Sequence, residues 1–512
     1  MSEVLFGQSY YLRFDPKLWE AMQPYPPLGT MYAASFLRSR GYDVALFDAM
    51  LAESEQEWEQ ALNREQPRFA VIYEDNFNYL SKMCLLRMRQ AAFEMSRMAR
   101  ACGCTVIVCG SDATDHIAEY MAHGADFVLV GEGEMTLVEL LDRLSGRGQT
   151  ALGDILGLAW GGEGAGQGVV VNRRRPDIAA VDVLPFPAWD LIEVERYRGI
   201  WRRRHGYYSM NMVTTRGCPY HCNWCAKPIW GQRYNARSPE NVAAEMKWLQ
   251  TSWHPDHIWF ADDIVGLKPG WWSRFADLVE QGGAVTPFKC LSRVDLLLRP
   301  GEVEAMKRAG CRIVWVGAES GSQKVLDAME KGTKVEQIYA AAALLHKHGI
   351  KIGFFLQFGY PGETRSDIER TLQMVRDCRP DDIGMSVSYP LPGTKFFARV
   401  KDQLGAKQNW QDSEDLAMLY DGPFATAFYR HLHTVLHKEY RAAKTWRGLW
   451  RRDGAPPPSL RQIGAMLYHT ATLPLARREL DRLARLPHRA LAPLPAGMSS
   501  LAAATPTPQE GE

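Results

Sequence analysis

Strand-sized apolar runs alternate with helix-length segments over residues 1–145, and no other feature of the sequence constrains the fold as strongly. The runs are VLFGQ, DVALFDA, FAVIYED, TVIVCGS and ADFVLVGEGE. Strands separated by helices form parallel sheets with helices on both faces. Residues 1–145 are therefore predicted to form an open, parallel, Rossmann-like α/β sheet.

The same alternation returns over residues 201–400. The candidate strands are YSMNMVTTRG, HIWFADD, FKCLSRV, IVWVGAES, KIGFFLQFG and DIGMSVSYP, with candidate helices between them. Six such units match a partial or complete α/β barrel, whose chemistry lies on the loops that follow the strands. We expect a partial (β/α)6 barrel in this second block.

The segments outside these two blocks have a different character. Residues 146–200 combine a glycine-rich stretch, predicted as a hairpin, with a proline-braced linker. Residues 401–450 are predicted to be mostly helical, and residues 451–512 to be a helical and low-complexity tail with a disordered end. The piece ARRELDRLARL of this tail is amphipathic. It could touch a membrane surface, but packing on the rest of the protein is the favoured interpretation.

Charge and hydropathy exclude several classes of protein. The chain has 60 basic and 59 acidic residues and a net charge of +1, so no strong field attracts nucleic acid. The N-terminus lacks the basic start and apolar stretch of a signal peptide. The longest apolar runs are too short to span a membrane. We expect a cytoplasmic protein without a nucleic-acid partner or a transmembrane segment.

Three cysteines, Cys218, Cys222 and Cys225, lie close together in RGCPYHCNWC, directly after the first strand of the second block. Ten cysteines in the chain are too few for a disulfide scaffold, which favours metal or redox chemistry. A structural zinc site needs four ligands, and the nearest candidate, His221, would make that site strained. Three thiolates without a fourth partner fit an iron–sulfur cluster with one exposed iron.

The C-x3-C-x2-C spacing, with Trp224 before the last cysteine, resembles the radical S-adenosylmethionine superfamily. The segments FADDIVG, LSRVDLL, VGAESGSQKVLDAMEKGT, FFLQFGYPGET and YPLPGTKFF resemble its later strands. PPLG, GSDAT and VGEGE resemble its cobalamin-binding subgroup. The resemblance covers residues 1–440.

This resemblance implies that Cys218, Cys222 and Cys225 hold a [4Fe-4S] cluster, whose fourth iron is chelated by S-adenosylmethionine. One electron from the reduced cluster would break a carbon–sulfur bond, and the deoxyadenosyl radical would remove a hydrogen atom from the substrate. Trp224 would form a wall beside this cofactor. The candidates at strand ends for holding S-adenosylmethionine are Asp262, Arg293, Glu319 and Ser320. The alternative for each of these four is an ordinary salt bridge at the end of a barrel strand.

The resemblance also implies that the first sheet binds cobalamin at the carboxyl ends of its strands, where ligands of open α/β sheets lie. The candidate residues are Tyr73, Glu74, Gly110, Ser111, Thr114, Gly131, Glu132 and Gly133. The glycines would permit close backbone approach. No D-x-H-x-x-G motif occurs in the chain, so no histidine is expected below the cobalt. Loss of cobalamin stays open, because a fold does not guarantee its site.

The resemblance favours a cobalamin-dependent radical methyltransferase. Its substrate would be a small molecule, natural-product-like or lipid-like, and flavodoxin or ferredoxin would be the electron donor. The first alternative is oxidative or ring-forming chemistry without methyl transfer, and the second is a zinc-stabilised binding module. The sequence identifies neither the catalytic residues nor the substrate.

Overall fold

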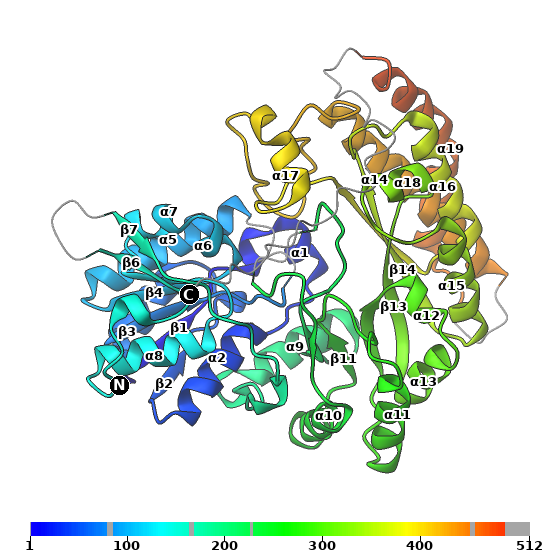
Figure 1. The fold of residues 1–512 in the computed structure, drawn as a ribbon. Coiled ribbons are helices and arrows are strands. Elements are labelled where there is room, and N and C mark those ends of the chain that lie inside the picture. The colour runs from blue at the N-terminus through cyan, green and yellow to red at the C-terminus, as the bar shows by residue number, and fades with distance from the viewer. Residues whose placement is uncertain (1, 79–84, 163–167, 226–228, 451–455, 487–512) are drawn as a thin grey trace, which may run out of the picture.

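A computed structural model describes residues 2–78, 85–162, 168–225, 229–450 and 456–486 (Figure 1). The N-terminal and central parts of the chain each form a parallel sheet covered by helices, and two long helices follow. The end of the predicted tail, residues 487–512, lies outside the described residues.

The N-terminal sheet, sheet A, confirms the predicted open parallel α/β sheet. Its parallel strands, in spatial order, are β2 (Val44–Leu46), β1 (Val4–Gly7), β3 (Phe69–Tyr73), β4 (Thr105–Cys109) and β5 (Phe127–Leu129). The glycine-rich stretch forms a hairpin of β6 (Leu158–Gly161) and β7 (Val169–Val171), which pairs antiparallel with β5. The strand order reverses between β1 and β3, so the crevice for a ligand is expected at their carboxyl ends.

Helices cover both faces of sheet A, because successive side chains of each strand point to opposite faces. Val4 and Phe6 pack with α2 (Leu28–Ser39) and α8 (Glu134–Leu144), whereas Leu5 packs with α3 (Gln56–Glu65) and α5 (Leu86–Ala101). The shorter helices of this half are α1 (Pro16–Ala21), α6 (Ser111–Asp115) and α7 (Ile117–Ala122). Sheet A is thus a buried layer whose carboxyl edge is left to loops.

The second sheet, sheet B, confirms the predicted partial barrel. Its six parallel strands follow chain order: β8 (Ser209–Met212), β11 (His257–Phe260), β12 (Phe288–Ser292), β13 (Cys311–Glu319), β14 (Lys351–Phe358) and β15 (Asp382–Val387). The helices of this half are α9 (Val194–His205), α10 (Pro239–Trp253), α11 (Trp271–Gln281), α12 (Val294–Leu297), α13 (Glu302–Ala309), α14 (Gln323–Ala328), α15 (Val335–Lys347), α16 (Arg365–Cys378) and α17 (Lys395–Val400). The strands β9 (Thr215–Arg216) and β10 (Asn235–Ala236) form a separate small ribbon.

The two faces of sheet B differ in burial. Ile352, Phe354 and Leu356 of β14 lie in the core, whereas Phe355 is 40% exposed. The Phe355 ring stacks on Trp315 of β13, with ring centroids 4.7 Å apart. On the same concave face, Lys289 of β12 lies over the rings of Tyr25 and Trp259, at 5.2 and 5.0 Å. The half-barrel therefore keeps part of its inner surface open.

Two long helices, α18 (Thr426–Leu449) and α19 (Leu460–Leu483), form a hairpin beside α16. The remaining 3-10 turns are η1 (Leu12–Phe14), η2 (Ala49–Leu51), η3 (Leu152–Asp154), η4 (Val181–Val183), η5 (Trp189–Leu191) and η6 (Lys401–Gln403). Within the described ranges, no helix combines the length and apolarity needed to cross a bilayer.

Candidate functional site

The three cysteines lie on one loop at the carboxyl end of β8, which is the expected mouth of the half-barrel. All three thiol-bearing residues, Cys218, Cys222 and Cys225, are partly exposed. The loop begins at Gly217, where φ is +80° and an added Cβ would lie 2.4 Å from the carbonyl oxygen of Arg233. This position therefore requires glycine.

Asn223 anchors the middle of the cysteine loop. Its backbone N–H donates to the carbonyl of Met329 at 3.1 Å, and its side-chain amide donates to the carbonyl of Ala328 at 2.8 Å. Its Oδ1 accepts a hydrogen bond from the hydroxyl of Tyr360 at 2.9 Å. The loop is thus tied to the end of α14 and to the residues after β14.

The donor set of the loop fits an iron–sulfur cluster. Within the part of the chain that the structure describes, no three His, Cys, Asp or Glu side chains converge as a metal site. The loop nevertheless carries three thiols, the ligands that such clusters use, on a segment without helix or strand.

Asp262 joins the ends of two neighbouring barrel strands. Its Oδ1 accepts hydrogen bonds from the backbone N–H groups of Thr214 and Thr215, at 2.8 and 2.6 Å, and from the Thr215 hydroxyl at 2.8 Å. Burial raises the pKa of Asp262 to about 7. Its Oδ2 is buried and has no hydrogen-bond partner among the described residues. This oxygen is a polar group available to a ligand.

A lysine that the sequence did not single out lies between several predicted residues. Lys331 donates to Glu319 at 2.8 Å, and its Nζ lies 6.0 Å from the ring centroid of Trp224. Arg293 donates to the Lys331 carbonyl at 3.0 Å. Although burial lowers the pKa of Lys331, Glu319 and Cys222 raise it above its ordinary value. Lys331 therefore stays cationic beside the cysteine loop.

Glu319 and Ser320 lie at the end of β13 but point to different partners. Glu319 has a left-handed backbone, with φ of +56°, a conformation that is uncommon outside glycine. The Ser320 hydroxyl lies 3.1 Å from that of Thr371 in α16. Asp262, Arg293 and Glu319 share the carboxyl edge of sheet B. Their binding to S-adenosylmethionine, with that of Trp224 and Ser320, stays a prediction.

Glu74 and Gly110 lie against each other at the carboxyl edge of sheet A. Both carboxylate oxygens of Glu74 accept the N–H of Ser9, at 3.1 and 3.2 Å, and burial raises the Glu74 pKa to about 7. An added Cβ at Gly110 would lie 2.7 Å from Cγ of Glu74, and one at Gly133 would lie 2.9 Å from the ring of Tyr73. The chain's own packing thus already requires both glycines.

The other residues predicted for cobalamin lie in the short helix α6 after β4 and on the loop after β5. Ser111 is buried, and Thr114 accepts the N–H of Gly131 at 3.4 Å. Gly131 has φ of +82°. The structure thus places the predicted cobalamin residues along one edge of sheet A, and their cofactor role stays a prediction.

Arg216, directly before the cysteine loop, forms ion pairs with two glutamates of the first half of the chain. Its guanidinium contacts Glu132 and lies 2.7 Å from Glu134, and each of these three side chains is at most 4% exposed. Trp230 donates to Glu132 at 3.2 Å, and the N–H of Ile178 donates to the other oxygen of Glu132 at 2.5 Å. The motifs RGC and GEGE are both evident in the sequence, but no local signal pairs them.

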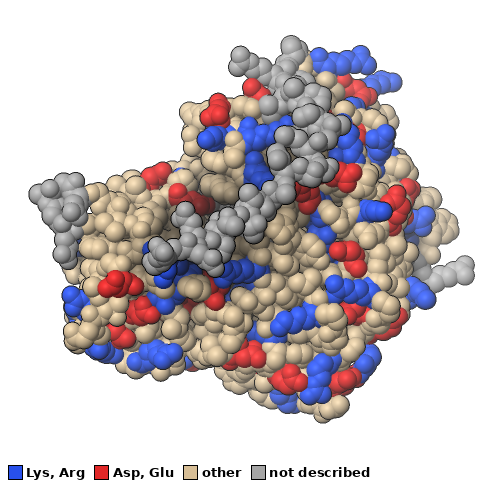
Figure 2. Space-filling view, in the orientation of Figure 1, with Lys and Arg blue, Asp and Glu red and all other residues tan. Residues whose placement is uncertain are grey.

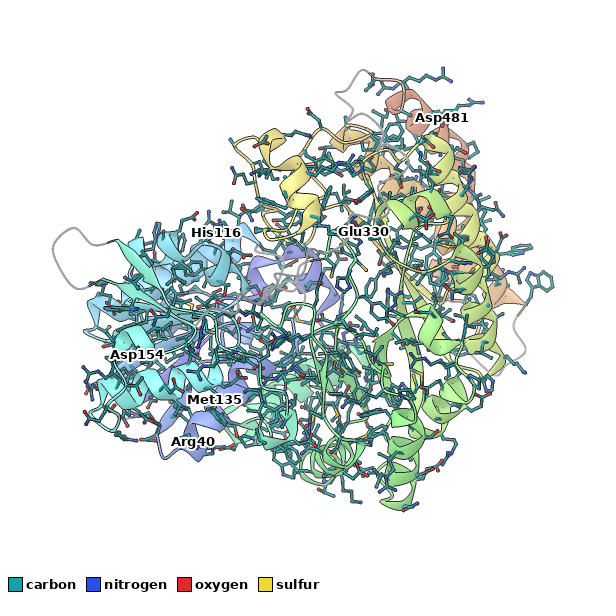
Figure 3. All side chains as sticks on the ribbon, viewed as in Figure 1. Arg40, His116, Met135, Asp154, Glu330 and Asp481 are labelled. Atoms are coloured by element: carbon teal, nitrogen blue, oxygen red, sulfur yellow. The ribbon has the colours of Figure 1, made fainter. Side chains whose placement is uncertain are left out.

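A small cavity lies beside this ion pair, between the edge of sheet A and the ribbon strand β9. It is lined by Gly29, Tyr73, Asn76, Phe77, Glu132, Glu134, Arg216, Ile229 and Trp230. Two of the residues predicted for cobalamin, Tyr73 and Glu132, therefore share a cavity with Arg216. Figure 3 labels Glu330, the residue before Lys331, near the place where the N-terminal and central parts of the chain meet.

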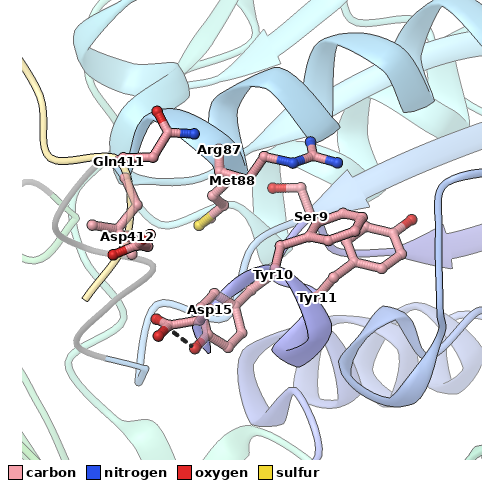
Figure 4. Close-up of a pocket in the computed structure, with 10 residues that line it drawn as sticks. Ser9, Tyr10, Tyr11, Asp15, Arg87, Met88, Gln411 and Asp412 are labelled. Atoms are coloured by element: carbon pink, nitrogen blue, oxygen red, sulfur yellow. Dashed lines mark hydrogen bonds between the residues drawn. The ribbon is translucent and has the colours of Figure 1, made fainter. Parts of the chain in front are cut away.

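A second small cavity lies after β1, where a segment from the C-terminal region docks on sheet A (Figure 4). It is lined by Ser9, Tyr10, Tyr11, Phe14, Asp15, Leu85, Arg87, Met88, Gln411 and Asp412. The Tyr10 hydroxyl donates to Asp15 at 3.3 Å, and the Ser413 hydroxyl donates to Asp15 at 2.5 Å. Residues far apart in the chain therefore enclose this part of the edge.

Comparison with known proteins identifies a matching family model and several similar sequences. Residues 212–375 match the model of the Radical SAM superfamily. An uncharacterized methyltransferase of Pyrococcus horikoshii is 31% identical over 292 residues, which are 56% of this chain and 60% of that protein. An anaerobic magnesium-protoporphyrin IX monomethyl ester cyclase of Rubrivivax gelatinosus is 24% identical over 390 residues, which are 74% of this chain and 67% of that protein. The chain thus spans 60% of the length of the first relative.

Two solved structures share the overall fold. One is the radical S-adenosylmethionine methyltransferase TsrM from Kitasatospora setae, with cobalamin and a [4Fe-4S] cluster bound; its TM-score is 0.61 at 19% identity, covering 79% of this chain and 78% of that one. The other is the cobalamin-dependent S-adenosylmethionine radical enzyme OxsB with aqua-cobalamin bound; its TM-score is 0.69 at 16% identity, covering 94% of this chain and 72% of that one. The arrangement of both sheets is therefore found in proteins of known structure.

Proposed function

We propose that this protein is a radical S-adenosylmethionine enzyme that also uses cobalamin, and the match of residues 212–375 to the model of the Radical SAM superfamily supports this. Cys218, Cys222 and Cys225 hold the [4Fe-4S] cluster, and cobalamin binds at the carboxyl edge of sheet A. The observation that carries the proposal is the place of the cysteine loop. It lies at the mouth of the half-barrel and is joined through Arg216 to the edge of sheet A.

When bound, the cluster would be held by Cys218, Cys222 and Cys225 and would supply the electron for reductive cleavage of S-adenosylmethionine. The chain's own residues position these partners. Asp262 keeps one buried oxygen without a hydrogen-bond partner among the described residues, while its other oxygen fixes the segment after β8. Lys331 holds Glu319 in place through an ion pair at 2.8 Å.

We further propose that the reaction adds a methyl group to a carbon atom of a small, natural-product-like or lipid-like substrate. The relative named as a methyltransferase and the likeness to the methyltransferase TsrM support this reaction. The second candidate is ring formation without methyl transfer, which the relative named as a cyclase supports. That relative aligns with 74% of this chain, compared with 56% for the relative named as a methyltransferase. Flavodoxin or ferredoxin is the proposed electron donor.

Anaerobic purification with iron, sulfide and cobalt quantified together tests the cofactor proposal. After reconstitution we expect iron and sulfide in the wild type and their loss in the variant Cys218→Ala/Cys222→Ala/Cys225→Ala. The control variant Cys102→Ala/Cys104→Ala/Cys378→Ala removes three cysteines far from the loop and should keep both. Iron without cobalt would refute the cobalamin part alone. A colourless wild type that binds zinc would refute the whole proposal.

Mass spectrometry of products tests the reaction. The reconstituted enzyme, given a low-potential reductant and S-adenosylmethionine labelled in its methyl group, should transfer the label to the product. A product that gains no label and loses hydrogen would favour ring formation. Cleavage of S-adenosylmethionine that persists in the triple cysteine variant would contradict the assigned ligands.

A further inference from the structure

The hairpin of α18 and α19 exposes a band of large apolar side chains. Between 56% and 88% of each residue is exposed; the band consists of Trp446, Trp450, Leu460, Leu467 and Leu475. The three leucines follow helical spacing, so they lie on one face of α19. The opposite face, with Met466, Ala476 and Leu480, is buried. More than half of each residue in the band is therefore not covered by the described chain.

The same hairpin is strongly basic. Residues 426–450 and 456–486 contain ten Lys and Arg side chains and three Asp and Glu side chains, a net charge of +7, whereas the whole chain carries +1. The three acids are engaged: Glu439 by Arg376 and Arg477, Glu479 by Arg482, and Asp481 by Arg365. Arg430 also pairs with Asp415 outside the hairpin, but most of the basic side chains have no acidic partner within the described hairpin, so it keeps an excess of positive charge.

Basic side chains continue the apolar face of α19. Arg478 is exposed and lies a whole number of helical turns beyond Leu460, so the two share a face. Arg461 and Arg485 are also exposed, and neither these two nor Arg478 has an ion pair with a described residue. Figure 2 shows basic side chains projecting at the end of the molecule where Figure 3 labels Asp481 of α19.

We propose that this face of the α18–α19 hairpin docks on the surface of a bilayer that contains anionic phospholipid. Tryptophan and leucine side chains enter the boundary between headgroups and acyl chains, and neighbouring arginines bind the anionic headgroups. Each basic residue near the surface of an anionic membrane adds favourable electrostatic binding energy. Added salt weakens this attraction by screening it. The protein would lie on the membrane without spanning it. This inference is independent of the proposed function.

Charge argues against the other occupants of the band. A second copy of the hairpin would bring two surfaces of net charge +7 together, and like charges repel. Nucleic acid would satisfy the arginines but would leave the leucines and tryptophans without apolar contact. The hairpin also packs on the outer side of the half-barrel, beside α16 and away from sheet A (Figure 1). It can meet a flat surface without covering the edge of sheet A.

Vesicle co-sedimentation of the full chain tests the proposal. The wild type should bind vesicles of phosphatidylcholine and phosphatidylglycerol at least about tenfold more tightly than vesicles of phosphatidylcholine alone, and high salt should weaken the binding. Leu460→Ser/Leu467→Ser/Leu475→Ser should lose about tenfold or more in affinity. Arg461→Gln/Arg478→Gln/Arg485→Gln should lose on the order of a hundredfold, and only in anionic vesicles.

A matched control replaces three exposed valines elsewhere, Val169→Ser/Val171→Ser/Val183→Ser, and should bind like the wild type. Circular dichroism of every variant checks that the fold is kept. Failure of the wild type to bind anionic vesicles would overturn the proposal, as would equal binding by the leucine variant. A wild-type dimer in light scattering that the leucine variant abolishes, without vesicle binding, would assign the band to a second copy instead.

Discussion

Replacement of Arg216 by methionine would remove the positive charge that two buried glutamates share. Methionine is flexible enough to fill much of the space, but Glu132 and Glu134 would keep their burial without a counter-ion. Loss of one partner from a buried ion pair costs about 3–5 kcal/mol. We expect a loss of this size in the free energy of unfolding, because each carboxylate is 4% exposed.

The size of this stability loss should depend on pH, because the buried carboxyl group of Glu132 can take up a proton. Burial already raises the pKa of Glu132, against the lowering by Arg216. Without Arg216 the carboxyl group of Glu132 would take up a proton more readily, since burial disfavours its charged form. A folded-state pKa raised above the unfolded value gives stability that is lost as pH rises. The variant should therefore be closer to the wild type at pH 5 than at pH 8.

Urea unfolding followed by circular dichroism measures these effects without added salt. The triple variant Arg216→Met/Glu132→Gln/Glu134→Gln removes all three charges and should recover most of the stability that Arg216→Met loses. The control Arg38→Met breaks an ion pair with Asp190 whose partners are 43% and 60% exposed, and should cost under about 1 kcal/mol. A loss below about 1 kcal/mol for Arg216→Met, or no recovery in the triple variant, would refute the reasoning.

Three further substitutions test the packing and charge of the two sheets. Gly110→Ala should lower the free energy of unfolding by about 1–3 kcal/mol, measured by urea unfolding, because its Cβ would lie 2.7 Å from Glu74; unchanged stability would contradict this contact. Burial raises the pKa of Glu74 to about 7, so the free energy of unfolding of the wild type should fall by on the order of 3 kcal/mol between pH 4.5 and 7. The variant Glu74→Gln should lack this part of the pH dependence. An equal pH dependence in both proteins would contradict the assignment to Glu74. Burial lowers the pKa of Lys289 from 10.5 to about 8, so Lys289→Met should raise stability by on the order of 3 kcal/mol at pH 7, and the gain should vanish above pH 10.5. Thermal melts across this pH range measure the gain, and a gain that persists above pH 10.5 would contradict the assignment.

Local periodicity was enough to predict both sheets. The strands β1 and β3 at the centre of sheet A are buried on both faces, so they appear in the sequence as unbroken apolar runs such as Phe69–Tyr73. The cysteine loop was also predictable, because its ligands lie within a few residues of one another. The hairpin β6–β7 follows from its glycines, but its pairing with β5 depends on an edge that only the folded sheet provides.

Contacts between distant segments could not be predicted in this way. Arg216 and Glu132 are separated by 84 residues, and Ser413 and Asp15 by 398. Lys331 lies in the turn after α14, where the sequence resembles an ordinary solvent-exposed loop. Its pairing with Glu319 requires the left-handed backbone at the end of β13. A single sequence carries no signal that relates such residues to each other.

The ion pairs of Arg216 also bear on how this fold can be recombined. Residues 1–145 and 201–400 form separate sheets, so a protein engineer would treat them as independent modules when building chimeras of related proteins. A crossover placed between Glu134 and Arg216 would separate the arginine from both of its acids. A chimera would then bury an unmatched charge at the junction, unless the donor and recipient share all three residues. The unit of exchange is therefore the pair of sheets together with this interface.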